Sequence, residues 1–419
     1  MKRRTALGLL AGGFSLQAQE SKCRIEALEL WEYQGTREAE RGVNGQYQVQ
    51  PLHAYDAYRP KEYRDGPVVE KGPQKTSAIY LKLKASGGVE GLYGPVDREA
   101  AIVIDQQIRA FLIGKDALAG DVAWDQLWRL NRHGRSGIFM MAISAVDNAL
   151  WDLRGRYFQA PVYRLLGGPS RNSVEVYGSC LGSSLEPAKV AARAKELLAQ
   201  GFRNQKWFLA DGPGSGSAGF ARNVRVAQIL RESLGSGGGM MFDVFNGWDL
   251  PYALQWCKEV EGLRPRWLEE PFSSEKVDAY ARLSASTSVP IATGEHFYGR
   301  WEVHQFLKAD AVRVVQADPE WCGGVSELKK ICTLASIYDV PVIPHGHNLH
   351  AAVHVVASES PTTCPLSEYL VLKMASYYHF DTNSLIPKNG RINLSERPGF
   401  GMEISRERVE KSKLLSWNP

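Results

Sequence analysis

The sequence of 419 residues lacks several features that mark well-known functional classes. No Cys-x-x-Cys pair occurs among its six cysteines, so thiolate zinc sites and thioredoxin-type redox chemistry have no support. No apolar run approaches the roughly 20 residues that a spanning helix needs, so we expect no membrane span. The net charge is only +4, and three of the positive charges (Lys2, Arg3 and Arg4) lie at the N-terminus. The remainder gives no electrostatic case for nucleic-acid binding.

The first 19 residues have the order of a secretory signal. A basic start precedes a short apolar stretch, residues 6–14, and a polar segment follows it. The Arg3-Arg4 pair indicates the twin-arginine route, so residues 1–19 predict export to the periplasm. The alternative is a basic N-terminus without a targeting role, which would leave the protein in the cytoplasm.

The rest of the chain has the composition of an ordinary globular protein, with 44% hydrophobic and 23% charged residues. From about residue 174 onward, short β-rich runs alternate with amphipathic helical stretches. The runs are residues 173–177, 203–209, 240–245, 266–270, 289–293, 311–316, 340–344 and 366–370. Eight strands alternating with helices imply parallel pairing and predict an α/β fold with a (β/α)8-type barrel.

The organisation before and after these units is different. Residues 24–135 predict an α+β capping domain, with strands at 25–30 and 76–84 joined by an aromatic, charged loop over 31–73. Helices are expected at 98–113 and 121–130, and a helix over 137–157 leads into the barrel domain, residues 136–377. The segment 378–419 lacks the barrel periodicity, and we expect it to return to the cap.

Acidic residues recur at the ends of three successive predicted strands. Intervals of 26 residues separate Asp243 from Glu269 and Glu269 from Glu295, one strand-plus-helix unit each. Because the carboxyl ends of barrel strands converge on one face, these side chains are expected to lie together. They would repel one another without a cation, and hard oxygen ligands select Mg²⁺. The spacing predicts a magnesium site and favours Glu269 over its neighbour Glu270.

The next predicted strand ends carry Asp318, His345 and Glu368. An Asp beside a His can fix the imidazole tautomer and stabilise its protonated form, which makes His345 a competent general base. His347 and His350 compete for this role, and the spacing of the strand ends favours His345. Together with the metal ligands, such a base indicates removal of the α-proton of a carboxylate substrate to form an enediolate.

At these residues the sequence resembles the enolase superfamily, within its mandelate racemase/muconate lactonizing branch. The resemblance covers nearly the whole chain after the leader and includes segments 142–153, 161–168 and 399–401. It implies a modified barrel, (β/α)7β, with an α+β cap whose loops choose the substrate. The implied chemistry is enolate formation on carboxylates.

Within that branch, segment 321–327, segment 344–346 and Glu368 are similar to acid-sugar dehydratases, particularly rhamnonate dehydratases. We expect Glu368 to hydrogen-bond the enediolate or the substrate carboxylate. The chain departs from the rhamnonate pattern after Gly346, where two serines are replaced by His347-Asn348.

Racemases of the branch carry Lys-x-Lys on the second strand, and the second Lys is a base. Here Lys206 takes the first position and Phe208 the second. The loss argues against two-base racemisation and leaves His345 as the base, while Lys206 would help to bind the carboxylate. The cap-loop residues His53, Arg59 and Arg64 are candidates for reading the rest of the substrate.

Other functional classes also fit parts of the sequence. Residues 214–219 satisfy G-x-G-x-x-G, which alone would suggest a dinucleotide-binding oxidoreductase. They lie in the second of eight units, however, and Asp243 is already the first metal ligand, so a βα loop is the better interpretation. A sugar-acid binding protein without turnover, or a racemase, epimerase or cycloisomerase, remains an alternative. The prediction is a Mg²⁺-dependent dehydratase of a small sugar acid, as a homo-oligomer.

Overall fold

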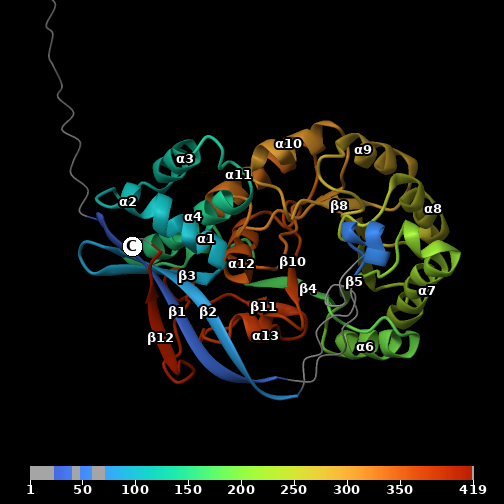
Figure 1. Cartoon of the computed structure of the whole chain (residues 1–419), viewed down its shortest axis with the longest axis horizontal. Helices are drawn as coiled ribbons and strands as arrows, with labels where there is room; N and C mark the ends of the chain where they lie inside the picture. The colour runs from blue at the N-terminus through green and yellow to red at the C-terminus, as the bar shows by residue number, and fades with distance from the viewer. Residues whose placement is uncertain (1–22, 40–47, 59–70, 418–419) are drawn as a thin grey trace, which may run out of the picture.

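The computed structural model describes residues 23–39, 48–58 and 71–417. In it a four-stranded antiparallel sheet stands beside a curled parallel sheet surrounded by helices (Figure 1). The predicted leader lies outside the described residues, as do Arg59 and Arg64. Among the described residues, no helix combines the length and the apolar character needed to cross a membrane.

The antiparallel sheet has the strand order β12-β1-β2-β3. Strand β1 spans Ile25–Ala39 and pairs with β2, Gly72–Ala85, over nearly its whole length. The expectation of a loop over residues 31–73 was therefore wrong at both ends. Side chains on both faces of β1, among them Leu28, Leu30 and Tyr33, are buried in the core, which explains why this aromatic stretch remains a strand.

Strand β3, Val89–Val96, was not expected from the sequence. It follows a turn in which Gly87 has φ +83° and Gly88 has φ +76°, a conformation that glycine adopts readily. The turn returns the chain as an antiparallel neighbour of β2. Helices α1 (Arg98–Val103), α2 (Arg109–Leu112) and α3 (Gly120–Leu130) complete this part, with a π-helical segment at Ile104–Ile108.

Helix α4, Gly137–Tyr157, has the bounds expected from the sequence and lies between β3 and the barrel helix α11. Its Asp152 carboxylate is buried and accepts hydrogen bonds from the backbone N–H groups of Leu92, at 2.8 Å, and Phe400, at 2.7 Å. One side chain of α4 thus fixes the N-terminal sheet and the C-terminal segment against each other.

The curled sheet has the strand order β10-β4-β5-β6-β7-β8-β9, with all seven strands parallel. The strands are β4 Ser173–Ser179, β5 Asn204–Phe208, β6 Gly239–Asp243, β7 Trp267–Glu269, β8 Ile291–Thr293, β9 Val314–Val315 and β10 Ser367–Leu370. Segment 341–344 lies between β9 and β10 and hydrogen-bonds to Val315 on one side and to Glu368 on the other. These bonds close the ring, as a barrel requires.

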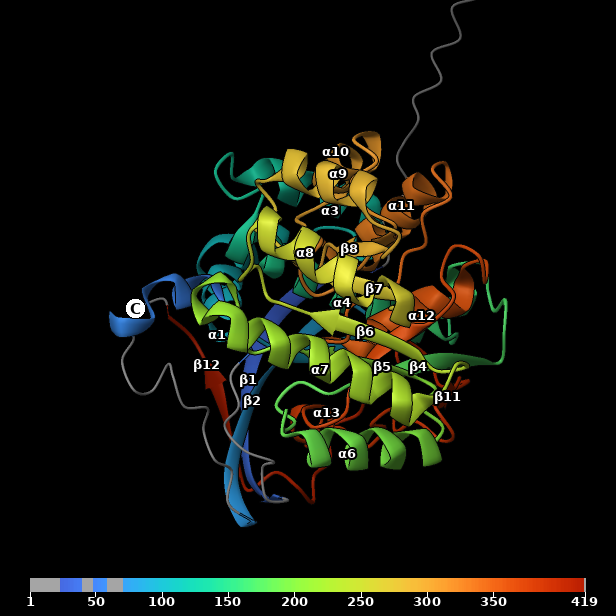
Figure 2. The ribbon, with the colours of Figure 1, turned by 90° about the vertical axis from the view of Figure 1, so that its right-hand side faces the viewer.

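Helices alternate with the strands on the outer face of the ring (Figure 2). They are α6 Pro187–Ala199, α7 Gly216–Leu234, α8 Leu250–Val260, α9 Val277–Ser286, α10 Arg300–Lys308, α11 Gly324–Ser336 and α12 Leu349–Ser358. Two short helices lie outside this alternation: α5, Val162–Leu165, precedes β4, and α13, Met374–Tyr377, follows β10. The ring interior is filled by a separate buried cluster of Tyr177, Met241, Trp267, Ala292, Val314, Ile343 and Leu366. The barrel is therefore a packed core, and chemistry is confined to the ends of its strands.

The C-terminal segment serves both parts of the molecule. Strand β11, Arg391–Asn393, pairs antiparallel with barrel strand β4. Strand β12, Lys411–Leu415, then pairs with β1 at the edge of the N-terminal sheet. Only the last part of this segment joins the sheet of the cap.

Candidate active site

Three carboxylates lie together at the carboxyl ends of neighbouring barrel strands. Asp243 is the last residue of β6 and Glu269 the last of β7, and the two are register partners. Glu295 follows β8 after Gly294. Each residue offers one carboxylate oxygen, and these oxygens lie within 4.8 Å of one another. The structure therefore brings together the three acids that the sequence singled out for Mg²⁺.

Burial gives this group an unusual electrostatic state. The pKa of Asp243 is raised to about 7, that of Glu269 to about 8 and that of Glu295 to about 7. The largest cause in each case is the loss of solvent around the buried carboxyl group. Repulsion between the carboxylates adds to the rise, whereas Lys206 opposes it. The three carboxyl groups therefore resist being ionised at the same time. A hard divalent cation such as Mg²⁺ prefers carboxylate oxygens as ligands and would stabilise their ionised form.

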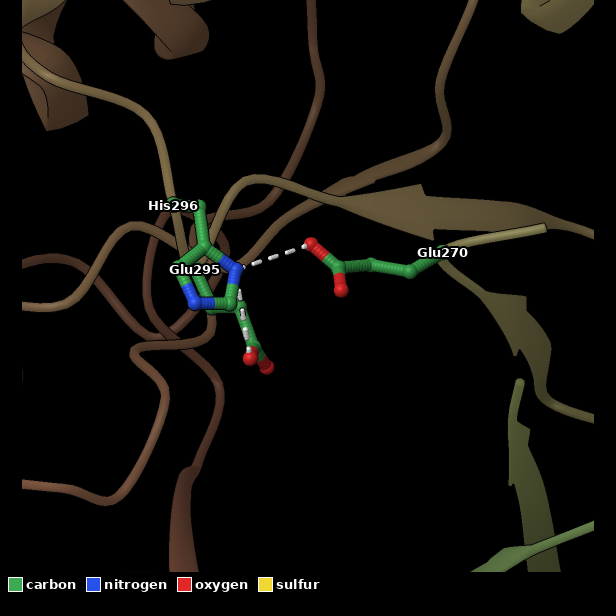
Figure 3. A group of neighbouring side chains, drawn as sticks. All are labelled: Glu270, Glu295 and His296. Atoms are coloured by element: carbon green, nitrogen blue, oxygen red, sulfur yellow. Dashed lines mark hydrogen bonds and ion pairs between the residues drawn. The ribbon is translucent and has the colours of Figure 1, made fainter. Parts of the chain in front are cut away.

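The side chain of Glu270, which could compete with Glu269 as a metal ligand, contacts different residues. Its carboxylate lies 3.5 Å from Nδ1 of His296 and accepts a hydrogen bond from Asn246 Nδ2 at 3.3 Å. Figure 3 shows His296 between the carboxylates of Glu270 and Glu295, so these three could also hold an ion. The Glu269 carboxylate instead accepts from the Trp267 indole at 2.8 Å and from Gln316 Nε2 at 2.7 Å. The two groups share Glu295 and lie side by side.

The predicted histidine–aspartate pair is present beside the acids. Nδ1 of His345 lies 2.8 Å from Oδ2 of Asp318, and both side chains are buried. The backbone N–H groups of Glu320 and His347 also donate to Asp318, at 2.7 and 3.0 Å. These bonds fix the Asp318 carboxylate, which in turn orients the imidazole.

The other ring nitrogen of His345 faces the acidic group. Nε2 lies 3.5 Å from Glu295 and 3.7 Å from Glu368. Burial alone would lower the pKa of His345, but Glu295, Glu368 and Asp318 together raise it to about 10. The imidazole is thus directed toward the place where the carboxylates converge.

Lys206 is buried among the carboxylates and is not on the surface. Its Nζ lies 3.0 Å from Glu368 and 3.4 Å from Asp243, and it also pairs with Glu269. Burial alone would lower the pKa of Lys206, but these carboxylates raise it well above its usual range. Lys206 and His345 in turn hold the pKa of Glu368 at about 2 against the effect of burial. Glu368 is therefore an ionised partner of both.

A small cavity opens at this point of the barrel. Polar and charged groups, among them His345 and Lys206, line it together with apolar side chains such as Phe208 and Leu370. The other lining residues are Ser179, Leu181, Asp243 and Phe245. Phe208 occupies the place on β5 where a second lysine would bring a second base. In the described part of the chain, His345 is the only imidazole that lines this cavity.

Gly346 allows the close approach of two of these strand ends. A Cβ at this position would lie 2.9 Å from both the Cγ and the backbone oxygen of Glu368. Gly346→Ala is expected to lower the free energy of unfolding by roughly 1–3 kcal/mol through overpacking, measured by urea denaturation. Gly237→Ala is the control, because a Cβ there meets nothing within 4 Å. Equal losses of unfolding free energy in both variants would show that close packing against Glu368 is not the cause.

The remaining sequence candidates have different surroundings. His53 lies in the short helix Pro51–Tyr58, which packs against the β5–α7 loop at residues 213–215. Figure 1 shows this blue helix over the barrel, away from β1. His350 is buried on α12, where its Nε2 lies 2.8 Å from Asp381, so it is engaged elsewhere. Glycines 214, 216 and 219 form the loop and first turn of α7.

Three residues of the site were not expected from the sequence. Gln316 and Trp267 hydrogen-bond to Glu269, and Trp321 stacks on His345 with ring centroids 5.1 Å apart. Gln316 was visible as a strand-end residue two positions before Asp318, but the inward direction of Trp267 had no signal in the sequence.

Comparisons with known proteins agree with this geometry. Residues 68–167 match the family described as mandelate racemase/muconate lactonizing enzyme, N-terminal domain, and residues 189–408 match the family described as enolase C-terminal domain-like. A provisionally named L-rhamnonate dehydratase from Caldivirga maquilingensis is 33% identical over 86% of this chain and 88% of its own. A D-galactarolactone cycloisomerase from Agrobacterium fabrum is 30% identical over 80% of this chain and 91% of its own.

A solved structure extends the likeness to the fold. The rhamnonate dehydratase from Gibberella zeae, in a crystal structure complexed with Mg, has a TM-score of 0.77 and 26% identity over 92% of this chain and 95% of its own. The shared barrel and antiparallel cap, together with matches to both of the family's domains, lead to one assignment. The chain belongs to the mandelate racemase/muconate lactonizing enzyme branch of the enolase superfamily.

Proposed function

We propose that the protein is a Mg²⁺-dependent dehydratase of a sugar acid. The proposed reaction removes the α-proton of an aldonate and eliminates its β-hydroxyl group as water, which leaves a 2-keto-3-deoxy acid. The observation that carries this proposal is one buried imidazole–carboxylate pair, His345 and Asp318, directed at a group of carboxylates suited to a divalent cation.

Asp243, Glu269 and Glu295 would hold the ion, and bound Mg²⁺ would supply positive charge that stabilises the negative charge of an enediolate. His345 removes the α-proton through Nε2, because Asp318 engages Nδ1. Lys206, buried beside Glu368, is placed to bind the substrate carboxylate. The apolar Phe208 offers no second base for returning a proton from another side, which favours elimination over racemisation.

A second candidate is cycloisomerisation of a sugar-acid lactone, favoured by the likeness to the cycloisomerase of Agrobacterium fabrum. This reaction also begins with removal of an α-proton, so the same base and metal ligands would serve it. The two candidates differ in the leaving group, which is water in one and the lactone carboxylate in the other.

The proposal predicts a positive result in a substrate screen. Purified protein with Mg²⁺ is incubated with a library of mono- and diacid sugars, and semicarbazide detects 2-keto-3-deoxy products. We expect at least one aldonate to give product, in amounts that depend on Mg²⁺. No product from any acid, combined with exchange of an α-proton into D₂O, would favour epimerisation. The absence of both product and exchange would contradict the proposed function.

A further inference from the structure

A second imidazole–carboxylate pair lies next to the first and has no role in the mechanism above. His347 pairs through Nδ1 with Glu320. The hydroxyl group of Tyr377 lies 3.2 Å from both carboxylate oxygens of Glu320 and 3.2 Å from the same imidazole nitrogen. His347 is one of the two residues at which this chain departs from the rhamnonate pattern after Gly346.

The two pairs share their supporting segments. Asp318 and Glu320 follow β9, while His345 and His347 follow segment 341–344, so each carboxylate meets the imidazole from the adjacent strand end. Asp318 also accepts the backbone N–H of His347 at 3.0 Å. A shift of either segment would therefore move both imidazole–carboxylate pairs together.

Trp321 holds the two imidazoles side by side. Its ring centroid lies 5.1 Å from that of His345 and 5.0 Å from that of His347. The two imidazole planes are within 12° of parallel, with centroids 6.4 Å apart. His345 lines the small cavity, and two adjacent carbons of a substrate held there, with their hydroxyl groups, are long enough to bridge the distance to His347. The Trp321 indole nitrogen is buried and has no hydrogen-bond partner among the described residues, so it can donate to a substrate oxygen.

The surroundings of His347 suit a proton donor. Glu320 engages Nδ1, so Nε2 is the nitrogen that can meet a ligand. Burial raises the pKa of the Glu320 carboxyl group, and the neighbouring His347 opposes the rise. Lys373, whose Nζ lies 4.8 Å from the centroid of the Tyr377 ring, adds positive charge beside the pair.

On the basis of the proposed dehydration, we infer that His347 is the general acid that protonates the departing β-hydroxyl group, while His345 is the base. His345 takes the proton from C2, and the C–H electron pair enters the enediolate. As the C2=C3 double bond forms, the C3–O bond breaks, and the Nε2 proton of His347 leaves with the oxygen as water. The enol then takes a proton from solvent at C3 and loses the proton of its C2 hydroxyl group to solvent, which forms the keto group. His345 releases its proton and His347 regains one. The net change is the loss of one water.

His347→Gln separates these steps. The variant keeps a polar side chain but cannot donate a proton of suitable acidity. We expect kcat for dehydration of the screened aldonate to fall by about 10²-fold or more, while exchange of the C2 proton into D₂O, measured by NMR, stays within about threefold of wild type. The 3-deoxy-3-fluoro analogue, whose fluoride leaves without a proton, should be converted at nearly the wild-type rate. His304→Gln, an exposed imidazole on α10, is the matched control.

Each other outcome overturns the inference. Dehydration by His347→Gln near the wild-type rate would show that the acid lies elsewhere. Equal losses in dehydration, fluoride elimination and exchange would show that His347 only positions other groups. If His347→Gln does not fold, Tyr377→Phe takes its place and should slow dehydration more than exchange; equal effects would overturn the inference. Wild-type protein that gives neither product nor exchange would refute the proposed function itself, and this inference with it.

Discussion

His345→Asn is expected to lower kcat by about 10³-fold or more, because it removes the proposed base. His345 is the imidazole that lines the cavity, and its Nε2 faces Glu295 and Glu368. The asparagine amide can still donate to Asp318, so the strand ends should keep their arrangement. Exchange of the α-proton into D₂O should disappear together with turnover, since both depend on the same proton transfer.

The control measurements decide what such a loss means. The variant should bind Mg²⁺ in isothermal titration and unfold at a temperature close to that of wild type. His304→Gln on the exposed face of α10 should keep full activity. If His345→Asn retained near-normal turnover, the mechanism proposed for His345 and Asp318 would be wrong.

Removal of Mg²⁺ is the second change with a large expected effect. A chelator should abolish turnover, and readdition of Mg²⁺ should restore it. Because the ion binds the folded chain and not the unfolded one, Mg²⁺ at a hundred times its Kd should raise the free energy of unfolding by about 2.7 kcal/mol. The physical reason is relief of the repulsion among Asp243, Glu269 and Glu295, whose oxygens lie within 4.8 Å of one another.

Thermal unfolding with and without Mg²⁺ measures this effect independently of turnover. Glu295→Gln should lose most of the stabilisation by Mg²⁺, whereas Glu407→Gln, an exposed acid in the C-terminal segment, should keep it. Wild-type unfolding that does not respond to millimolar Mg²⁺ would contradict the assignment of these acids as metal ligands.

Much of the barrel could be predicted because its signals are local. Helix α4 has the expected bounds, and its run of apolar residues needed no knowledge of the partners it packs against. The equal spacing of Asp243, Glu269 and Glu295 matches the length of one strand-plus-helix unit. Residues with this spacing end neighbouring strands, so the three acids lie close together in the structure. Strands β7, β8 and β9 are shorter than the runs expected from the sequence.

Features that depend on distant segments were missed. Strand β1 continues to Ala39 because β2 pairs with it along that length, and the charged sequence of this stretch did not show it. Tyr377 meets Glu320 and His347 only through the closure of the barrel and the path of the chain after β10. The burial of Lys206 among three carboxylates likewise depends on strands β6, β7 and β10 together.

The central claim is that this site removes an α-proton and expels water. The most direct test is the mass of the product formed in D₂O from the aldonate identified in the screen. We predict a product lighter than its substrate by one water and carrying one deuterium from solvent at C3. A product that has lost no water and differs from its substrate only by one solvent deuterium at carbon would mean isomerisation and would contradict the dehydratase assignment. A dehydrated product without solvent deuterium would mean that the C2 hydrogen moves to C3 without exchange, which would contradict protonation of the enol by solvent.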